Sequence, residues 1–289
     1  LPFKLIKSLV QVRGIFKRFR PDAVIGVGGY SSFPVLRFAQ SKGIPSFIHE
    51  SNSFAGKANI MLGRKATRVF VASDGMEKFF PAAKITESGN PVRATIANSG
   101  LSREEGIRFF GLDPAKKTVL SIGGSLGAKS INESLDKAID EFGLNNLQLI
   151  WQTGKPYAAR GKERAAGRPD VWVSDFINQM EYAYAAADLV ISRSGAMAIA
   201  ELCVTKKAAV FVPFPYAAED HQTANAQSLV NKGAGILIPD REALEKLVPA
   251  VVSLSKDETK QESLKRQIGM LAVANADEKI ATEILKHIG

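Results

Sequence analysis

The sequence predicts an α/β fold built from two domains, each with a parallel sheet covered by helices. Short apolar runs of strand length alternate with helical patterns through most of the chain. The alternation comes in two sets, separated by a polar stretch near residues 94–100. The length of 289 residues also suits about two domains. Such alternation favours parallel, doubly wound sheets, because a helix carries the chain back across the sheet between parallel strands.

The composition sets limits on the class of protein. With 45% hydrophobic and 23% charged residues, the chain has the composition of a globular protein. This excludes a collagen, a coiled coil and a mainly disordered chain. No apolar run reaches the roughly 18 residues that a membrane-spanning helix needs. The single cysteine, Cys203, excludes a disulfide framework and a cysteine-based zinc site, and it favours a reducing, cytoplasmic compartment. The net charge of +9 favours phosphate-bearing partners, but an ordinary basic surface explains it equally well.

The first domain is expected over residues 1–95. It opens on an amphipathic helix, Leu1–Pro21, that no strand precedes. Apolar runs then predict strands and helices in turn: strands at Asp22–Gly29, Pro45–Glu50 and Arg68–Ala72, and helices at Pro34–Lys42 and Asn59–Lys65.

The second domain is expected over residues 96–289. Its predicted strands are Thr118–Gly123, Leu147–Gln152, Val171–Val173, Leu189–Ser192, Ala209–Pro213 and Gly235–Ile238. Its predicted helices are Ser130–Phe142, Gln179–Ala187, Ala196–Val204 and Gln222–Lys232, followed by terminal helices over Glu242–Ile288.

Ligands of doubly wound folds bind at the carboxyl ends of the strands, so the residues that follow each strand are the candidates for a site. Two glycine-rich stretches occupy such places, Gly26–Ser32 and Gly123–Ala128. Glycine lets a backbone approach a ligand, and the free N–H groups at a following helix start attract anions. Each stretch alone is equally consistent with a tight turn, whereas one in each domain favours phosphate binding.

Polar residues follow other strands. His49-Glu50-Ser51-Asn52 carries groups suited to acid–base work and to hydrogen bonds with a sugar, although a loop cap explains His49 alone as well. The stretch Ser192–Glu201 is a turn that opens an apolar helix, which suits a diphosphate at its start. Glu201 on that helix can accept hydrogen bonds from vicinal ribose hydroxyls, and Gln222 is expected to face the same site. No Asp-x-Asp occurs, and the chain has three histidines, so a metal site at a diphosphate is not expected.

Taken in order, the stretches GVGGYSSFP, HESN, GNPVR, GGSLGA, SRSGAMAIAE and DHQTANA resemble the MurG family across essentially the whole chain. These bacterial glycosyltransferases move N-acetylglucosamine (GlcNAc) from UDP-GlcNAc to lipid I, the undecaprenyl-linked MurNAc-pentapeptide, giving lipid II for peptidoglycan. The resemblance implies the GT-B architecture, two Rossmann-like domains facing a cleft. It implies an acceptor-binding N-terminal domain, a UDP-GlcNAc-binding C-terminal domain, inversion at the sugar, and no cofactor.

The resemblance also assigns residues. Asn52 corresponds to an asparagine at the donor sugar, Arg93 to a phosphate-side arginine and Ser125 to a serine near the diphosphate. Ile177 corresponds to the residue against the uracil, and Gln222 to the glutamine at the sugar hydroxyls. The helix start, made of Ala196, Met197, Ala198, Ile199, Ala200 and Glu201, corresponds to the segment that holds diphosphate and ribose. His49 and Glu50 are the tentative catalytic pair.

Two departures from the family pattern stand out. Ser51 takes the place of the usual glutamine in His-Glu-Gln-Asn. The family's first strand and its Gly-Gly-Thr-Gly-Gly-His loop, which carries the favoured candidate for the catalytic base, have no counterpart in residues 1–289. One alternative is therefore a fragment that binds the donor without catalysis. Another is an enzyme similar to UDP-GlcNAc 2-epimerase. Nucleic-acid binding lacks an aromatic and basic platform in the sequence.

The resemblance implies a peripheral location on the cytoplasmic face of the bacterial inner membrane, where lipid I resides. The helix Leu1–Pro21 mixes apolar residues with six bases, which predicts attraction to an anionic membrane surface. We expect Phe3, Leu5, Ile6 and Leu9 to face the membrane, and Phe16 and Phe19 to pack on the sheet.

Overall fold

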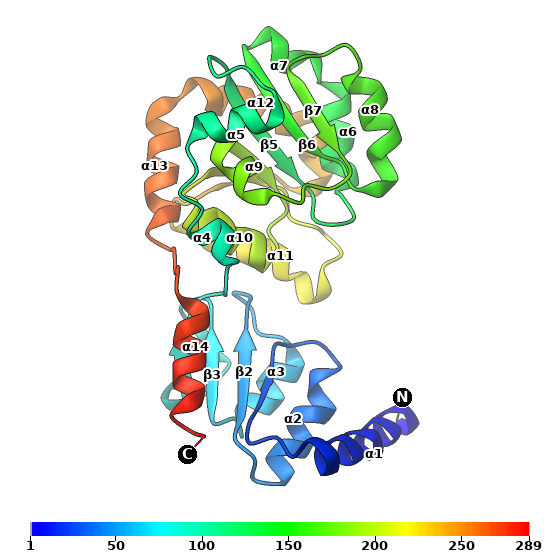
Figure 1. Cartoon of the computed structure of the whole chain (residues 1–289), viewed down its shortest axis with the longest axis vertical. Coiled ribbons are helices and arrows are strands. Elements are labelled where there is room, and N and C mark those ends of the chain that lie inside the picture. Colours follow the sequence, from blue (N-terminus) through cyan, green and yellow to red (C-terminus); the bar gives the residue numbers. More distant parts are fainter. Residues whose placement is uncertain (1, 289) are drawn as a thin grey trace. The chain divides into compact units, whose positions relative to one another are not determined.

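The computed structural model of the protein describes residues 2–288, with side chains from Lys7 onward. The chain divides into two compact units (Figure 1). The first unit consists of Leu1–Pro91 together with Asn275–Gly289, and the second unit is Val92–Ala274. Each unit is a parallel sheet flanked by helices, which confirms the predicted fold class of two α/β domains.

The first unit holds a four-stranded parallel sheet in the order β1-β2-β3-β4. Its elements are α1 (Pro2–Phe19), β1 (Val24–Gly26), α2 (Ser32–Ser41), β2 (Ser46–Glu50), α3 (Lys57–Gly63), β3 (Arg68–Val71), β4 (Ile85–Glu87) and α14 (Ala276–Leu285). The alternation of side chains along β2 and β3 explains how helices cover both faces. Ile48 and Val69 contact the cluster that includes Leu36 of α2 and Leu62 of α3, whereas Phe47 and Phe70 lie on the opposite face.

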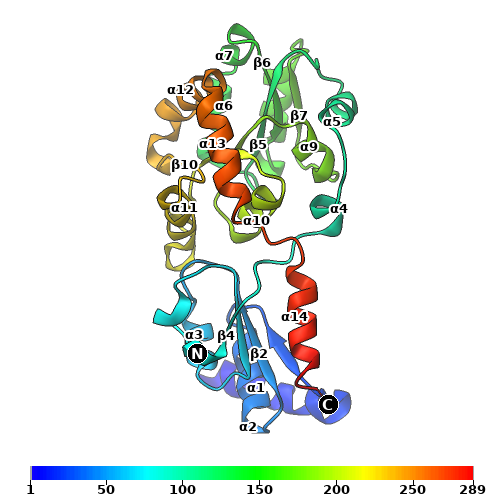
Figure 2. The same ribbon diagram turned by 90° about the vertical axis from the view of Figure 1, so that its left-hand side faces the viewer.

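Helix α14 covers that opposite face of the first sheet (Figure 2). Ile280 packs with Phe47 and Phe70, and Glu283 pairs with Arg68 of β3 at 3.0 Å. The prediction that all terminal helices belong to a second domain of residues 96–289 therefore fails for this helix. Two stacked phenylalanines would otherwise be exposed on the first sheet, and α14 removes them from water.

Helix α1 packs on α2 through Val12 and Phe16, and the Phe16 ring lies 5.0 Å from that of Phe38. Phe16 thus packs against a helix, whereas packing on the sheet was expected. Phe19 is 77% exposed, so the expectation that it packs is wrong. It lies at the last residue of the helix, on the rim of a groove with Ile25 and Ile284. Leu9 is half-buried. The side chains of Phe3, Leu5 and Ile6 lie outside the described residues.

The second unit holds a six-stranded parallel sheet in the order β10-β9-β8-β5-β6-β7. Its strands are β5 (Lys117–Ile122), β6 (Leu147–Gln152), β7 (Val171–Ser174), β8 (Leu189–Ser192), β9 (Ala208–Phe211) and β10 (Ile236–Leu237). Its helices are α4 (Ala94–Ala97), α5 (Arg103–Phe110), α6 (Lys129–Lys137), α7 (Asp140–Leu144), α8 (Ala158–Ala165), α9 (Met180–Ala186), α10 (Ala196–Val204), α11 (His221–Asn231), α12 (Ala243–Lys256) and α13 (Glu258–Gly269).

Two hydrophobic cores lie on the two faces of this sheet. Leu120 and Val190 face the core shared with α5, α9 and α10, while Val119 and Ile191 face the core shared with α6 and α12. Figure 2 shows these two groups of helices on either side of β5 and β6. Because the strands are buried on both faces, they read as continuous apolar runs in the sequence.

Several short elements were not predicted. Strand β4 and helix α5 lie between the predicted strands Arg68–Ala72 and Thr118–Gly123, where no element was predicted. The start of α5 could have been predicted from the sequence, because Ser102 and Glu105 form a capping box. The predicted helix Ser130–Phe142 is divided into α6 and α7.

Candidate active site

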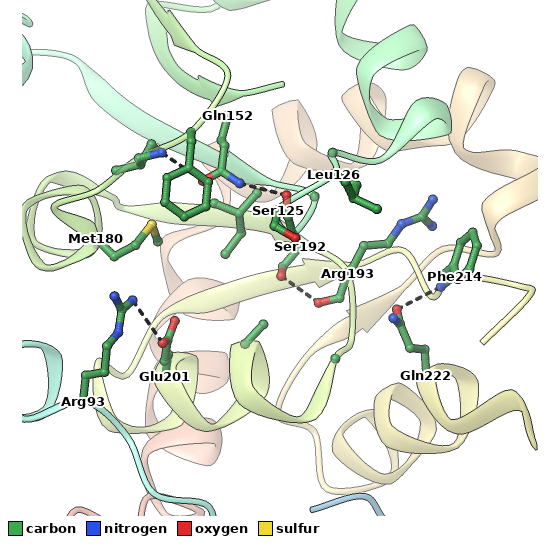
Figure 3. A pocket seen from close by; sticks show the side chains of 18 residues that line it. Arg93, Ser125, Leu126, Gln152, Met180, Ser192, Arg193, Glu201, Phe214 and Gln222 are labelled. Atoms are coloured by element: carbon green, nitrogen blue, oxygen red, sulfur yellow. Dashed lines mark hydrogen bonds and ion pairs between the residues drawn. The ribbon is translucent and has the colours of Figure 1, made fainter. Parts of the chain in front are cut away.

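The order of the second sheet places a cavity at its carboxyl edge. From the centre of the sheet, β5, β6 and β7 follow one another toward one edge, and β8, β9 and β10 follow one another toward the other edge. The order in which the chain adds strands therefore reverses between β5 and β8. Five strands end in one row, because Ile122 pairs with Gln152 and Ser192, Gln152 with Ser174, and Ser192 with Phe211. A cavity of about 440 Å³ opens above this row, within the second unit (Figure 3). Crevices at such switch points bind ligands in doubly wound folds.

The glycine loop after β5 lines one side of the cavity. Gly123, Gly124, Ser125 and Gly127 all contribute to the lining. Gly127 has a φ of +75°, and a Cβ there would collide with the carbonyl oxygen of Thr153. Glycine is therefore required at this position for the loop to lie against the end of β6. The Ser125 hydroxyl is exposed beside the cavity and can donate to an anion.

Helix α10 begins directly after β8 at the floor of the cavity. Its N-cap is Gly195, which has no side chain to cap the helix. The hydroxyl of Ser194 donates to the carbonyl oxygen of Gln222 at 2.7 Å, which ties the turn before α10 to α11. The start of α10 carries a partial positive charge and lies at the cavity that Ser125 also lines, which is an arrangement suited to a phosphate group.

Glu201 projects from α10 into the same cavity, as Figure 3 shows. Its Oε2 accepts a hydrogen bond of 2.8 Å from the Tyr184 hydroxyl, and its Oε1 lies 3.4 Å from Nη2 of Arg93. The Arg93 side chain is 57% exposed, so this ion pair contributes little stability. The carboxylate is therefore held mainly by Tyr184.

Gln152, at the end of β6, connects two of the loops that line the cavity. Its Nε2 donates to the carbonyl oxygen of Gly124 at 3.0 Å, and its Oε1 accepts from the backbone N–H of Ile177 at 3.3 Å. Ile177 is buried beside Met180, while Phe176 is half exposed at the same end of the cavity. This apolar end can receive a flat ring. Gln152 was not among the predicted residues, and only its position at a strand end could have indicated it.

The charge of Arg193 would suit a phosphate ligand, but its guanidinium is bound to groups of the protein itself. Its guanidinium is buried, and it donates to the carbonyl oxygens of Val212 and Pro213 and pairs with Asp240. Its Nη2 also donates to the Ser130 hydroxyl. The guanidinium thereby fixes the loop after β9.

That loop in turn orients Gln222. The Phe214 N–H donates to Oε1 of Gln222 at 3.0 Å, so the amide is held with its oxygen toward the backbone of the loop (Figure 3). The amide nitrogen of Gln222 remains as a donor at the cavity.

In the first unit, His49 and Glu50 lie at the end of β2 and are 4% and 3% exposed. The Nε2–H of His49 donates to the carbonyl oxygen of Gly89 at 3.0 Å, and its Nδ1 accepts from Ser51 at 3.2 Å. Both ring nitrogens are thus engaged, and the carbonyl oxygen of Gly89, which can only accept, fixes the tautomer. Burial lowers the pKa of His49 below its usual value, so the ring is neutral at pH 7.

Glu50 organises the loop that follows β2. Its Oε1 accepts from the backbone and side-chain amides of Asn52, and its Oε2 accepts from the Gly56 N–H and from Asn59. Four donors at 2.8–3.2 Å occupy the carboxylate. Asn90 donates to the carbonyl oxygen of Ser51, which ties the GNPVR segment to the HESN segment.

The structure places some of the predicted site residues together in one cavity. Arg93, Ser125, Ile177, Ala198, Glu201 and Gln222 all line the cavity of the second unit. Ala196 and Met197 belong to the first turn of α10 without lining it, and Ile199 and Ala200 pack on the hydrophobic core. Asn52, His49 and Glu50 lie in the first unit. Within residues 2–288, no three His, Cys, Asp or Glu side chains are grouped to hold a metal ion.

The burial of His49 predicts a pH effect on stability. The unfolded chain binds a proton at His49 near pH 6.5, whereas the folded protein does so only at lower pH. The free energy of unfolding should therefore fall as the pH drops below about 6.5. Urea unfolding of the parent and of His49→Gln, which keeps a donor for Gly89, at pH 7.5 and 5.5 measures this. The stability lost on acidification should be smaller in the variant, and an equal loss in both proteins would contradict the prediction.

Known proteins match the chain over both units. The glycosyltransferase family 28 N-terminal domain matches residues 1–71, and the family 28 C-terminal domain matches residues 118–283. Two relatives, from Parabacteroides distasonis and Phocaeicola vulgatus, are named UDP-N-acetylglucosamine--N-acetylmuramyl-(pentapeptide) pyrophosphoryl-undecaprenol N-acetylglucosamine transferase. Each is 48% identical, over 99% and 98% of this chain and 78% and 76% of their own lengths.

Solved structures agree with these matches. The crystal structure of Acinetobacter baumannii MurG superposes with a TM-score of 0.81 and 31% identity, over 99% of this chain and 79% of that one. The UDP-GlcNAc 2-epimerase from Neisseria meningitidis, at 14% identity and a TM-score of 0.70 over 98% of this chain and 81% of that one, shares the fold alone. The chain therefore belongs to glycosyltransferase family 28 and, within it, to the MurG family.

Proposed function

We propose that the chain is a glycosyltransferase that moves GlcNAc from UDP-GlcNAc to the muramyl 4-hydroxyl of lipid I. The reaction inverts the anomeric centre and gives lipid II and UDP. The observation that carries the proposal is the cavity at the switch point of the second sheet, where a glycine loop, the start of a helix and a carboxylate converge. The names of relatives at 48% identity support the same reaction.

The diphosphate of the donor fits between the glycine loop and the start of α10. As the acceptor hydroxyl attacks C1 of GlcNAc, the bond to the diphosphate oxygen breaks and negative charge grows on UDP. The partial positive charge at the start of α10 and the hydroxyl of Ser125 are already in place, and they stabilise that charge. Arg93, which is exposed at the rim of the cavity, can turn from Glu201 toward a phosphate when the donor binds.

The remaining parts of the donor follow from this placement. The uracil lies at the apolar end beside Ile177 and Phe176, and the ribose hydroxyls donate to the carboxylate of Glu201. Gln222, at the end of the cavity near Phe214, donates to the hydroxyls of the sugar. Asn52 of the first unit is the proposed further contact of that sugar.

His49 and Glu50 act through the loop that they hold. Both are buried, and each makes its hydrogen bonds within the first unit. A group that accepts a proton from the acceptor must come within hydrogen-bonding distance of it. We therefore assign these two residues to positioning Asn52 and the GNPVR segment.

The products formed from UDP-GlcNAc test the proposed reaction. The chain is incubated with labelled UDP-GlcNAc, with and without lipid I, and the products are separated. GlcNAc on lipid I, with UDP released only when lipid I is present, is the expected outcome. UDP-ManNAc formed without acceptor would contradict the proposal in favour of a 2-epimerase. Donor binding without any product would favour a binding module.

We also propose that α1 attaches the enzyme to the anionic surface of the membrane that holds lipid I. The helix contains no acidic residue, and Lys7, Arg13, Lys17, Arg18 and the adjoining Arg20 are all exposed. Three large apolar side chains, Val10, Ile15 and Phe19, are exposed on the same helix. Bases near an anionic surface contribute about 1 kcal/mol each, and apolar side chains can then enter the headgroup region. No described helix is long and apolar enough to span a bilayer.

Co-sedimentation with vesicles of phosphatidylglycerol and phosphatidylcholine tests this attachment. Binding should grow with the anionic fraction and fall with salt, because salt screens the attraction. The double change Lys17→Glu and Arg18→Glu should weaken binding roughly tenfold or more. Lys129→Glu with Lys246→Glu, at exposed positions of the second unit, is the control of equal charge. If both double variants lose binding equally, net charge explains it and α1 is not the docking surface.

A further inference from the structure

Tyr184 does not line the cavity, but its hydroxyl contacts Glu201, which does. Its ring is 1% exposed, within the core that α9 shares with α5 and α10. Its hydroxyl donates to Oε2 of Glu201 at 2.8 Å. Neither the sequence motifs nor the proposed reaction assigns this tyrosine a role.

We propose that Tyr184 is a positioning residue that fixes the Glu201 carboxylate for the two ribose hydroxyls, and that it thereby sets the selectivity for a ribonucleotide donor. This inference rests on the proposed function, because it takes Glu201 as the ribose ligand. Tyr184 acts only through Glu201 and does not touch the donor.

The geometry of the carboxylate supports this role. A carboxylate has two oxygens with about four acceptor positions in all. Tyr184 occupies one position on Oε2, and Arg93 lies at one position of Oε1. Each oxygen keeps one position for a hydroxyl from the cavity. Two neighbouring hydroxyls of a ribose match that pair of positions, one hydroxyl to each oxygen.

The other contacts of Glu201 cannot fix its side chain in the same way. Arg93 is mostly exposed and lies at 3.4 Å, so it holds the carboxylate weakly. Thr205 donates to the backbone carbonyl oxygen of Glu201, which anchors the helix and not the side chain. A glutamate side chain has several rotatable bonds, and binding must order it unless the protein has already done so.

Tyr184 is suited to order it. Its ring is clamped in the core, so its hydroxyl has a fixed place. Burial, together with the charge of Glu201, raises the pKa of Tyr184 well above its usual value, so the hydroxyl keeps its proton and always donates.

Selectivity follows from the same contact. A site with a fixed acceptor for a hydroxyl disfavours an analogue that lacks it, because the acceptor is then left without its partner. A mobile carboxylate can turn toward water or toward Arg93 instead, and it discriminates less.

The test compares UDP with 2′,3′-dideoxyuridine diphosphate, each titrated into the whole chain by calorimetry. The parent should prefer UDP. Tyr184→Phe should lower the ratio of the two affinities about tenfold by weakening UDP binding, with dideoxyuridine diphosphate bound nearly as before. The matched control is Tyr157→Phe, which removes a similar tyrosine–carboxylate bond of 2.7 Å to Asp136 away from the cavity. The control should keep the parental ratio even if both variants melt at a lower temperature.

Glu201→Gln separates this inference from the function on which it rests. If Glu201→Gln lowers the ratio and Tyr184→Phe leaves it at the parental value, the positioning role is wrong and the ribose assignment stands. If Glu201→Gln also leaves the ratio unchanged, or if the parent does not prefer UDP, the ribose assignment itself fails. A ratio lowered to the same extent by Tyr157→Phe would make the effect one of general stability and would overturn the inference.

Discussion

The parallel pairing of β5 with β8 is the constraint on which the candidate site depends. Ile122 pairs with Ser192, so the two strands end at the same level, and the chain leaves them toward opposite edges of the sheet. The crevice between the two departing loops is a consequence of that topology. The glycine loop and the start of α10 are brought together across it although about 70 residues separate them in the sequence. A ligand with a negative charge meets the glycine loop on one side of it and the positive end of α10 on the other.

Around this crevice, most charged and amide side chains are bound to the protein itself. Arg193 fixes the loop after β9, Gln152 joins the glycine loop to Ile177, and Tyr184 holds Glu201. Such side chains need little reordering when a ligand binds, so more of the interaction energy remains for affinity and for the transition state. In the first unit, Glu50 and His49 serve in the same way as supports for the loops that carry Asn52 and Asn90.

The sequence allowed the fold class and much of the site to be predicted, because both depend on local signals. Strands buried on both faces are continuous apolar runs, and Ser125, Glu201 and Gln222 follow such runs directly or lie on the next helix. Contacts between distant segments left no such trace. Tyr184 and Gln152 have ordinary surroundings in the sequence and acquire their roles only through Glu201 and Ile177. The place of α14 depends likewise on Phe47 and Phe70, more than 200 residues away.

The central claim is that the cavity of the second unit binds the UDP part of the donor, with Glu201 on the ribose. The most direct measurement is a calorimetric titration of the parent and of Glu201→Ala with UDP and with UDP-GlcNAc. Both ligands share the ribose, so both affinities should fall together, by about 1.5–3 kcal/mol for each hydrogen bond lost to the carboxylate. Unchanged affinity for UDP in Glu201→Ala would contradict the account.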